Sequence, residues 1–174
     1  SIQGFSARMR WPGYHNGAPN GLWYTAPDQM SDLYHRALEA GVQVHTHTNG
    51  DQATQMALDM LEPALRAHPS PDHRFTLQHC QLADAAQFRK MAKLGMCVNL
   101  FANHHFYWGD EHYRLTVGPE RATRMNACRT ALASGVPALI PVVSLTSPPR
   151  RFQAQPKLTR VRVLGSKNIL PRIA

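Results

Sequence analysis

Two short stretches of the sequence, VHTHTNGD at residues 44–51 and TLQHCQ at residues 76–81, decide how this chain folds. The first alternates β-branched and polar residues, which is typical of a strand, and its Asn-Gly-Asp end predicts a turn into a helix. The second is a short strand pattern that ends in a histidine. Between them, apolar residues recur at helical spacing from Ala53 to Leu65. The sequence therefore predicts a strand, a helix and a second strand.

The same alternation continues outward on both sides. A helix is expected before the first strand, because Thr25 and Asp28 form a capping-box pattern and Gly41 follows the last apolar position. Its apolar stripe consists of Met30, Leu33, Tyr34, Ala37 and Leu38. After the second strand, Asp84 is suited to cap a helix that Gly95 ends. A third strand is expected at 96–100 and a fourth helix from Pro119 to about Ser134.

Two segments have no such period. Residues 1–24 are rich in turn formers and predict a long irregular loop. Long loops of this kind are often active-site lids or binding loops. Residues 101–117 are expected to form an aromatic loop. Apolar strands alternating with helices indicate an α/β fold with parallel strands, either a doubly wound sheet or an incomplete (β/α)8 barrel. A complete barrel needs about 250 residues, and the chain has 174.

Charge divides the chain into two blocks. Residues 1–137 hold 12 Lys and Arg and all 11 acidic residues, whereas residues 138–174 hold 7 Lys and Arg and no acid. All 10 histidines also lie in the first block. The formal charge of +8 therefore belongs to the tail, and nucleic acid is not the expected partner of the first block. A basic nucleic-acid-binding module formed by the tail at 138–174 is the alternative function.

Cysteine usage and hydropathy favour a cytoplasmic protein without a membrane partner. Cys80, Cys97 and Cys128 are widely spaced and odd in number, which indicates neither a disulfide framework nor a cysteine zinc site. No apolar run of about 18 residues and no secretory leader pattern is present. Because the chain begins with Ser1, we expect a piece of something longer.

Histidines stand where the expected strands end. His47 and His79 close two successive strands, and His104 follows the third. Parallel strands present their carboxyl ends to one rim, so His47 and His79 are candidate ligands of a metal that activates water. Histidines that only satisfy backbone groups inside the sheet are the alternative.

Neighbouring residues leave further alternatives open. His45 lies on the same strand face as His47 and either shares a metal with it or packs one layer deeper. Asp51 is interpreted as a helix cap in preference to a carboxylate that supports a metal ligand. Cys80 is interpreted as a buried, inert thiol. An aromatic run either lines an apolar pocket or packs on the barrel: Phe106, Tyr107 and Trp108.

In combination, the opening GFSA at residues 4–7 and the stretches at 44–51 and 76–81 resemble the amidohydrolase superfamily, and more narrowly its amidohydrolase-3, or YtcJ-like, branch. The resemblance covers about residues 1–137. It implies a (β/α)8 barrel with a divalent metal, most often zinc, that hydrolyses carbon–nitrogen bonds of small non-peptide amides. It also implies that His47 and His79 are metal ligands.

The chain departs from that pattern at both ends. The family's strand-one histidine pair and strand-four lysine would precede Ser1. Its strand-eight aspartate should follow Gly135-Val136-Pro137, but no acid occurs after that point, so no catalytic residue is assigned and no substrate-binding residue either. We therefore expect an incomplete or inactive fragment that associates or aggregates through open barrel edges. The tail at 138–174 is interpreted as non-homologous, from a reading-frame shift or a fusion, with a genuine basic extension as the alternative.

Overall fold

The computed structural model describes residues 1–139. The tail expected at 138–174 therefore lies outside the described residues, except for its first two positions. In chain order the elements are α1 (Pro27–Glu39), β1 (His45–Thr48), α2 (Asp51–Ala67), β2 (Thr76–His79), α3 (Ala85–Lys93), β3 (Cys97–Leu100), α4 (Asn103–Glu111), the π-helix η1 (His112–Thr116), α5 (Gly118–Thr123), α6 (Cys128–Ala133) and β4 (Ala138–Leu139).

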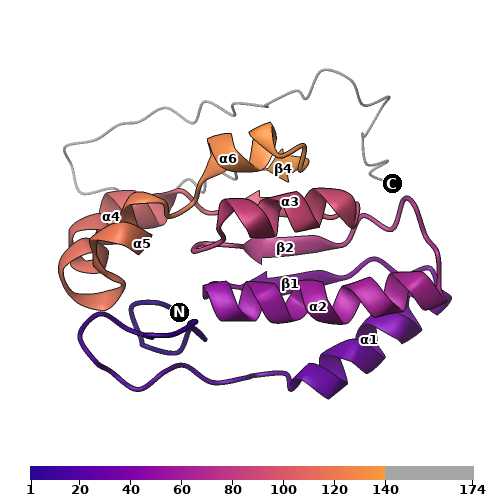
Figure 1. The fold of residues 1–174 in the computed structure, drawn as a ribbon, viewed down its shortest axis with the longest axis horizontal. Helices are drawn as coiled ribbons and strands as arrows, with labels where there is room; N and C mark the ends of the chain where they lie inside the picture. The colour runs from indigo at the N-terminus through magenta and orange to yellow at the C-terminus, as the bar shows by residue number, and fades with distance from the viewer. Residues whose placement is uncertain (140–174) are drawn as a thin grey trace, which may run out of the picture.

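The four strands form one parallel sheet in the order β1-β2-β3-β4 (Figure 1). Each strand pairs with the next one along the chain, and helices connect them. A doubly wound sheet reverses its strand order at a switch point, whereas this order is sequential throughout. The α/β prediction is confirmed, and of the two architectures that the sequence allowed, the chain adopts consecutive units of a (β/α)8 barrel.

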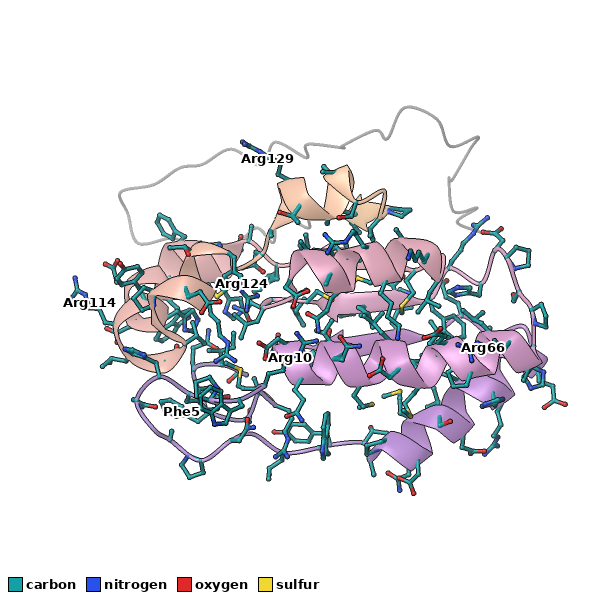
Figure 2. The ribbon with its side chains drawn as sticks, viewed as in Figure 1. Phe5, Arg10, Arg66, Arg114, Arg124 and Arg129 are labelled. Atoms are coloured by element: carbon teal, nitrogen blue, oxygen red, sulfur yellow. The ribbon has the colours of Figure 1, made fainter. Side chains whose placement is uncertain are left out.

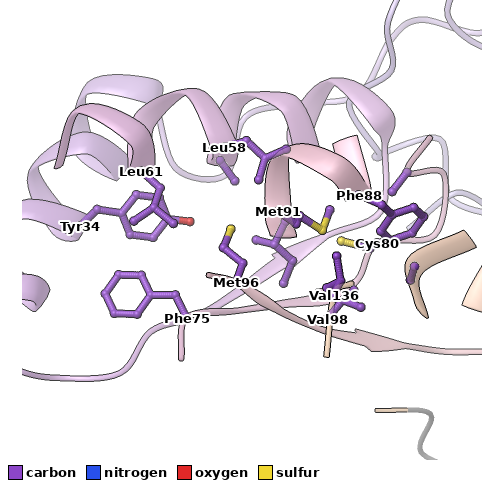
Figure 3. Packing of buried hydrophobic residues seen from close by; sticks show 14 of the residues in the cluster. Tyr34, Leu58, Leu61, Phe75, Cys80, Phe88, Met91, Met96, Val98 and Val136 are labelled. Carbon is purple, nitrogen blue, oxygen red and sulfur yellow. The ribbon is translucent and has the colours of Figure 1, made fainter. Parts of the chain in front are cut away.

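One face of the sheet is covered by helices. Thr46, Leu77 and Val98 stand in one row of the parallel register, and all three are buried. Leu77 and Val98 belong to one apolar core with residues of the helices, including Tyr34 of α1 and Leu61 of α2, and Figure 3 shows Val98, Tyr34 and Leu61 in this core. The Tyr34 hydroxyl and the Thr46 hydroxyl are hydrogen-bonded at 2.8 Å. The bond satisfies the buried Thr46 hydroxyl, and the side chains of His45 and His47, which alternate with the buried threonines, lie on the exposed face of β1.

Several helix ends follow the sequence expectations. Asp84 caps α3 by accepting a hydrogen bond from the Gln87 backbone N–H at 2.8 Å. Gly41 follows Ala40, the C-cap residue of α1, and adopts a left-handed φ of 65°. The expected cap of α1 is wrong, since the helix begins after Ala26, whose backbone N–H donates to the Gln29 side chain at 3.3 Å. Leu33 is 42% exposed, because the buried face of α1 is narrower than the expected apolar stripe and consists of Met30, Tyr34 and Leu38.

Two expectations for the second half of the chain are also wrong. The segment 101–117 is helical over most of its length, as α4 and η1, although α4 buries no residue and so shows no apolar period. The helix expected from Pro119 to Ser134 is divided into α5 and α6. Asn126 between them has a left-handed φ of 52°, and its backbone N–H donates to the Gln81 carbonyl at 2.9 Å.

Residues 1–24 contain no helix or strand, as expected. Ile2 and Met9 are nevertheless fully buried, in a second apolar cluster that includes Leu82 and Met125. This cluster joins the N-terminal segment to α5 at one end of the sheet, on the left of Figure 1. None of the described helices is long and apolar enough to cross a membrane.

Candidate metal centre

The ends of β1 and β2 bring His47 and His79 together. The register pairs His47 with Gln78 and Thr48 with His79, so the two histidines come from adjacent strands at the same edge. Their rings lie 4.6 Å apart between centroids, at an interplanar angle of 70°. Thr46 and Thr48 are buried on the helix-covered face, whereas His47 between them is exposed on the open face. The two imidazoles that the sequence suggested as metal ligands are therefore neighbours in space.

The backbone at the end of β2 is what turns His79 to this face. His79 and Cys80 both have left-handed φ angles, 71° and 43°. Strict alternation would place His79 with Leu77 against the helices. Instead Leu77 and Cys80 belong to the covered core, and the His79 ring lies against His47. A left-handed φ costs a non-glycine residue about 1–2 kcal/mol, and such strain concentrates at functional sites.

The site keeps its imidazoles neutral. Burial, and then the neighbouring His47, lower the pKa of His79 to about 4. Burial also lowers the pKa of His47. Neutral imidazole is the form that binds a metal, so both rings are available as ligands at neutral pH.

His45 does not join the pair. Its Nδ1 is 2.8 Å from the Gln78 side-chain nitrogen, and Gln78 accepts a hydrogen bond from the Asn99 amide at 2.6 Å. Side-chain hydrogen bonds thus link β1, β2 and β3, with His45 in an earlier register row than Gln78 and Asn99. Of the two roles considered for His45, the structure shows hydrogen bonding one layer away from His47.

Asp51 has a different role from the expected helix cap. The cap position of α2 belongs to Gly50, and Asp51 is the first helical residue, 2% exposed. Its carboxylate accepts a hydrogen bond from the Arg10 backbone N–H at 2.9 Å and pairs with Arg121 Nε at 3.2 Å. Figure 2 shows Arg10 next to this end of α2 and Arg124 above it, toward α5. The buried carboxylate therefore holds the N-terminal loop and α5 together, and sequence spacing gave no sign of it.

Gly50 is fixed by the same loop. A Cβ atom at this position would stand 1.9 Å from the Arg8 carbonyl oxygen, which is backbone and cannot move aside. Arg8 also stacks on Trp23, with its guanidinium carbon 5.3 Å from the ring centroid. Arg8, Trp23 and His47 border a small cavity of about 90 Å³ at the end of β1.

Aromatic and polar residues extend the site toward α4. The centroid of the Phe101 ring lies 5.6 Å from that of His79 and 4.8 Å from that of His104. His104 Nδ1 is 2.7 Å from the Gln3 side-chain nitrogen, which anchors the start of α4 to the N-terminal segment. His112 is fully buried behind His104 and was not singled out from the sequence, because it follows an aromatic run without a period.

The remaining sequence candidates are also located. Cys80 is fully buried, and burial raises its pKa to about 12, in agreement with an inert thiol. Of the aromatic run, Tyr107 and Trp108 border a hollow and are 46% and 45% exposed, and Phe106 is 72% exposed. Within residues 1–139, no group of three or more His, Cys, Asp and Glu side chains is arranged to hold a metal ion. The described chain thus offers a pair of imidazoles.

Comparison with known proteins identifies the family. The amidohydrolase family profile matches residues 8–141, which is most of the chain. The chain belongs to the amidohydrolase family. An N-substituted formamide deformylase from Arthrobacter pascens is 30% identical to this amidohydrolase chain over 137 residues, or 71% of the chain and 24% of the relative. The protein LONG AFTER FAR-RED 3 from Arabidopsis thaliana is 28% identical over 115 residues, or 66% of the chain and 20% of the relative.

Solved structures show the same fold. A metal-dependent hydrolase from Pyrococcus furiosus matches with a TM-score of 0.69 and 21% identity, over 85% of this chain and 30% of the hydrolase. Another from Pyrococcus horikoshii OT3 matches with a TM-score of 0.68 and 19% identity, over 85% and 29%. The amidohydrolase chain spans between a fifth and a third of the length of these four proteins.

Proposed function

We propose that this chain supplies His47 and His79 as two ligands of a divalent metal centre, with zinc as the ion, in a hydrolase of carbon–nitrogen bonds. The observation that carries the proposal is the pair itself. Two neutral imidazoles from adjacent strand ends lie 4.6 Å apart, and one of them is turned toward the other by a left-handed backbone. Both rings stand at the carboxyl ends of parallel strands, the end of the barrel at which barrel enzymes bind substrate.

The donor set fits such an ion. Imidazole nitrogen is a preferred zinc ligand, and the lowered pKa values of His47 and His79 keep both rings unprotonated. A bound divalent ion supplies Lewis acidity, which activates water for attack on a carbonyl carbon. The two histidines contribute by holding the ion at the strand ends, and the strained backbone of His79 fixes its ring orientation.

The proposed substrate class is a small, non-peptide amide. Membership of the amidohydrolase family supports hydrolysis, and the name of the Arthrobacter relative describes an N-substituted formamide as its substrate. A catalytic zinc usually has three protein ligands, and the described residues present two. We therefore expect the chain alone to bind zinc weakly and to turn over amides slowly or not at all.

Zinc titration of the chain by calorimetry tests the ligand assignment. Replacing either ligand, in His47→Ala or His79→Ala, should remove measurable zinc binding. The matched control is His45→Ala, which lies on the same strand and face but is hydrogen-bonded to Gln78. That control should keep zinc affinity within about twofold, because affinity changes of tenfold or more come from ligands and their direct supports.

Two results would contradict the proposal. Zinc binding that survives in both His47→Ala and His79→Ala would place the metal elsewhere. Loss of binding in His45→Ala but not in His79→Ala would show that the two histidines of β1 form the site instead. Fast zinc-dependent amide hydrolysis by the chain alone, abolished in His47→Ala, would refute only the expectation of slow turnover.

A further inference from the structure

Helix α4 carries aromatic side chains that belong to neither apolar cluster of the protein. It buries no residue, yet Phe106, Tyr107 and Trp108 follow one another within it. Tyr107 and Trp108 are each almost half exposed. Aromatic rings carry a large apolar area, and contiguous exposed apolar surface of this kind marks binding sites. Their exposure therefore requires an explanation outside the two apolar clusters of the protein.

Tyr107 and Trp108 form part of the wall of a hollow. It has a volume of about 280 Å³. The residues around it are Phe101, Asn103, His104, Tyr107 and Trp108. A closed apolar cavity of about 150 Å³ already accepts benzene, so the hollow has room for a substituted aromatic ring. Its walls offer ring faces and edges, which favour stacked and edge-on contacts with another ring.

The hollow adjoins the candidate metal centre. Phe101 belongs to both, because it lines the hollow and its ring lies 5.6 Å from the His79 ring. His104 also borders the hollow, and its ring centroid lies 4.8 Å from that of Phe101. A molecule whose carbonyl group lies at the His47 and His79 pair can thus extend past Phe101 toward Trp108.

From this continuity we infer that the α4 hollow binds the aromatic or bulky apolar substituent of an amide substrate. The inference rests on the proposed function for the location of the reacting bond. It adds a substrate class, amides that carry a ring-sized apolar group beside the scissile bond. Small aliphatic amides leave the hollow unfilled and gain nothing from it.

Binding of two probe amides tests the hollow without any need for turnover. Benzamide and acetamide share a carboxamide group and differ by one ring. We expect ligand-observed NMR on the full chain, with EDTA present, to detect benzamide binding and to show acetamide at least about tenfold weaker. Trp108→Ala should weaken benzamide binding by about fivefold to tenfold, the value of one aromatic contact. Tyr107→Ala should act in the same direction.

The matched control is Trp11→Ala, which removes an indole that is 92% exposed and outside the hollow. It should leave benzamide binding unchanged. Equal binding of benzamide and acetamide, or unchanged binding in both Trp108→Ala and Tyr107→Ala, would overturn the inference. Self-association of the wild-type chain that Trp108→Ala abolishes, seen by sedimentation without benzamide binding, would assign the hollow to a second copy and would also overturn it.

The outcome for the hollow is independent of the outcome for the proposed metal ligands. His47→Ala with EDTA present should retain benzamide binding, because the hollow is formed by α4 and Phe101. If zinc binding proves independent of His47 and His79 while benzamide still requires Trp108, the hollow is real and the metal assignment is wrong. If zinc behaves as proposed and benzamide does not bind, only the hollow is refuted.

Discussion

The two faces of the sheet are built for different purposes. On the helix-covered face, Leu77 and Val98 are fully enclosed by apolar side chains, and even the hydroxyl of Thr46 is hydrogen-bonded to a helix. On the other face, one residue further along each strand, stand His47, Gln78 and Asn99, which are only partly covered. We therefore expect substitutions on the covered face to lower the free energy of unfolding strongly. Substitutions on the open face, which carries the proposed chemistry, should change the free energy of unfolding little.

The largest expected effect is a difference in unfolding free energy between substitutions of two phenylalanines. Phe88 of α3 is fully buried in the covered core, whereas Phe106 of α4 is 72% exposed. Phe88→Ala should reduce the free energy of unfolding by about 3–5 kcal/mol, because it removes a buried ring and leaves a cavity. Phe106→Ala should change it by less than about 0.5 kcal/mol. Urea denaturation followed by circular dichroism measures both, and equal losses would mean that α4 is part of the stabilising core.

The sequence was informative where local chemistry controls local structure. Asp84 and Gly41 act at helix ends through their own side chain or backbone, so their positions could be read directly. The family pattern likewise singled out His47 and His79, and the parallel strand ends explain why they meet. Predictions of this kind depend only on residues that are close together in the sequence.

The rest depended on contacts between distant segments. Helix α4 turns its aromatic side chains outward, so it has no apolar stripe to detect. The break between α5 and α6 is fixed by Asn126, which is hydrogen-bonded to the segment after β2. The buried role of Asp51 needs Arg121, 70 residues away. Periodicity and capping rules contain no information on such partners.

The next effect is on the pH dependence of stability and arises from a histidine of η1 that is buried next to His104. His112 is fully buried, its Nδ1 is 2.7 Å from the Thr116 hydroxyl, and its Nε2 has no partner among the described residues. Burial, and then His104 and His105, lower the pKa of His112 from 6.5 to about 4. A proton therefore binds the unfolded chain first as the pH falls below 6.5, so the folded state loses stability between 6.5 and about 4.

That loss should be visible in the urea midpoint at two pH values. Between pH 7 and pH 5.5, His112 should account for about 1 kcal/mol of the decrease in unfolding free energy. His112→Gln removes the titrating ring and should make the decrease smaller by that amount. If the decrease in unfolding free energy is the same in the variant as in the wild type, protonation of His112 costs the folded state nothing. Burial of this histidine would then not make stability depend on pH.

The smallest effect separates strain from packing on β2 itself. His79 has a left-handed φ of 71°, which glycine adopts without the cost that a side chain incurs. His79→Gly should therefore raise the free energy of unfolding by about 0.5 kcal/mol, although it removes a proposed metal ligand. The adjacent Gln78→Gly should lower it by about 1 kcal/mol, because Gln78 lies within the strand and is hydrogen-bonded to Asn99. Changes of opposite sign in the free energy of unfolding at these neighbouring positions would show that the left-handed backbone at the end of β2 orients His79 for the site and lowers stability. A loss in His79→Gly as large as that in Gln78→Gly would mean that the His79 ring contacts contribute to stability in the same way as packing on the covered face.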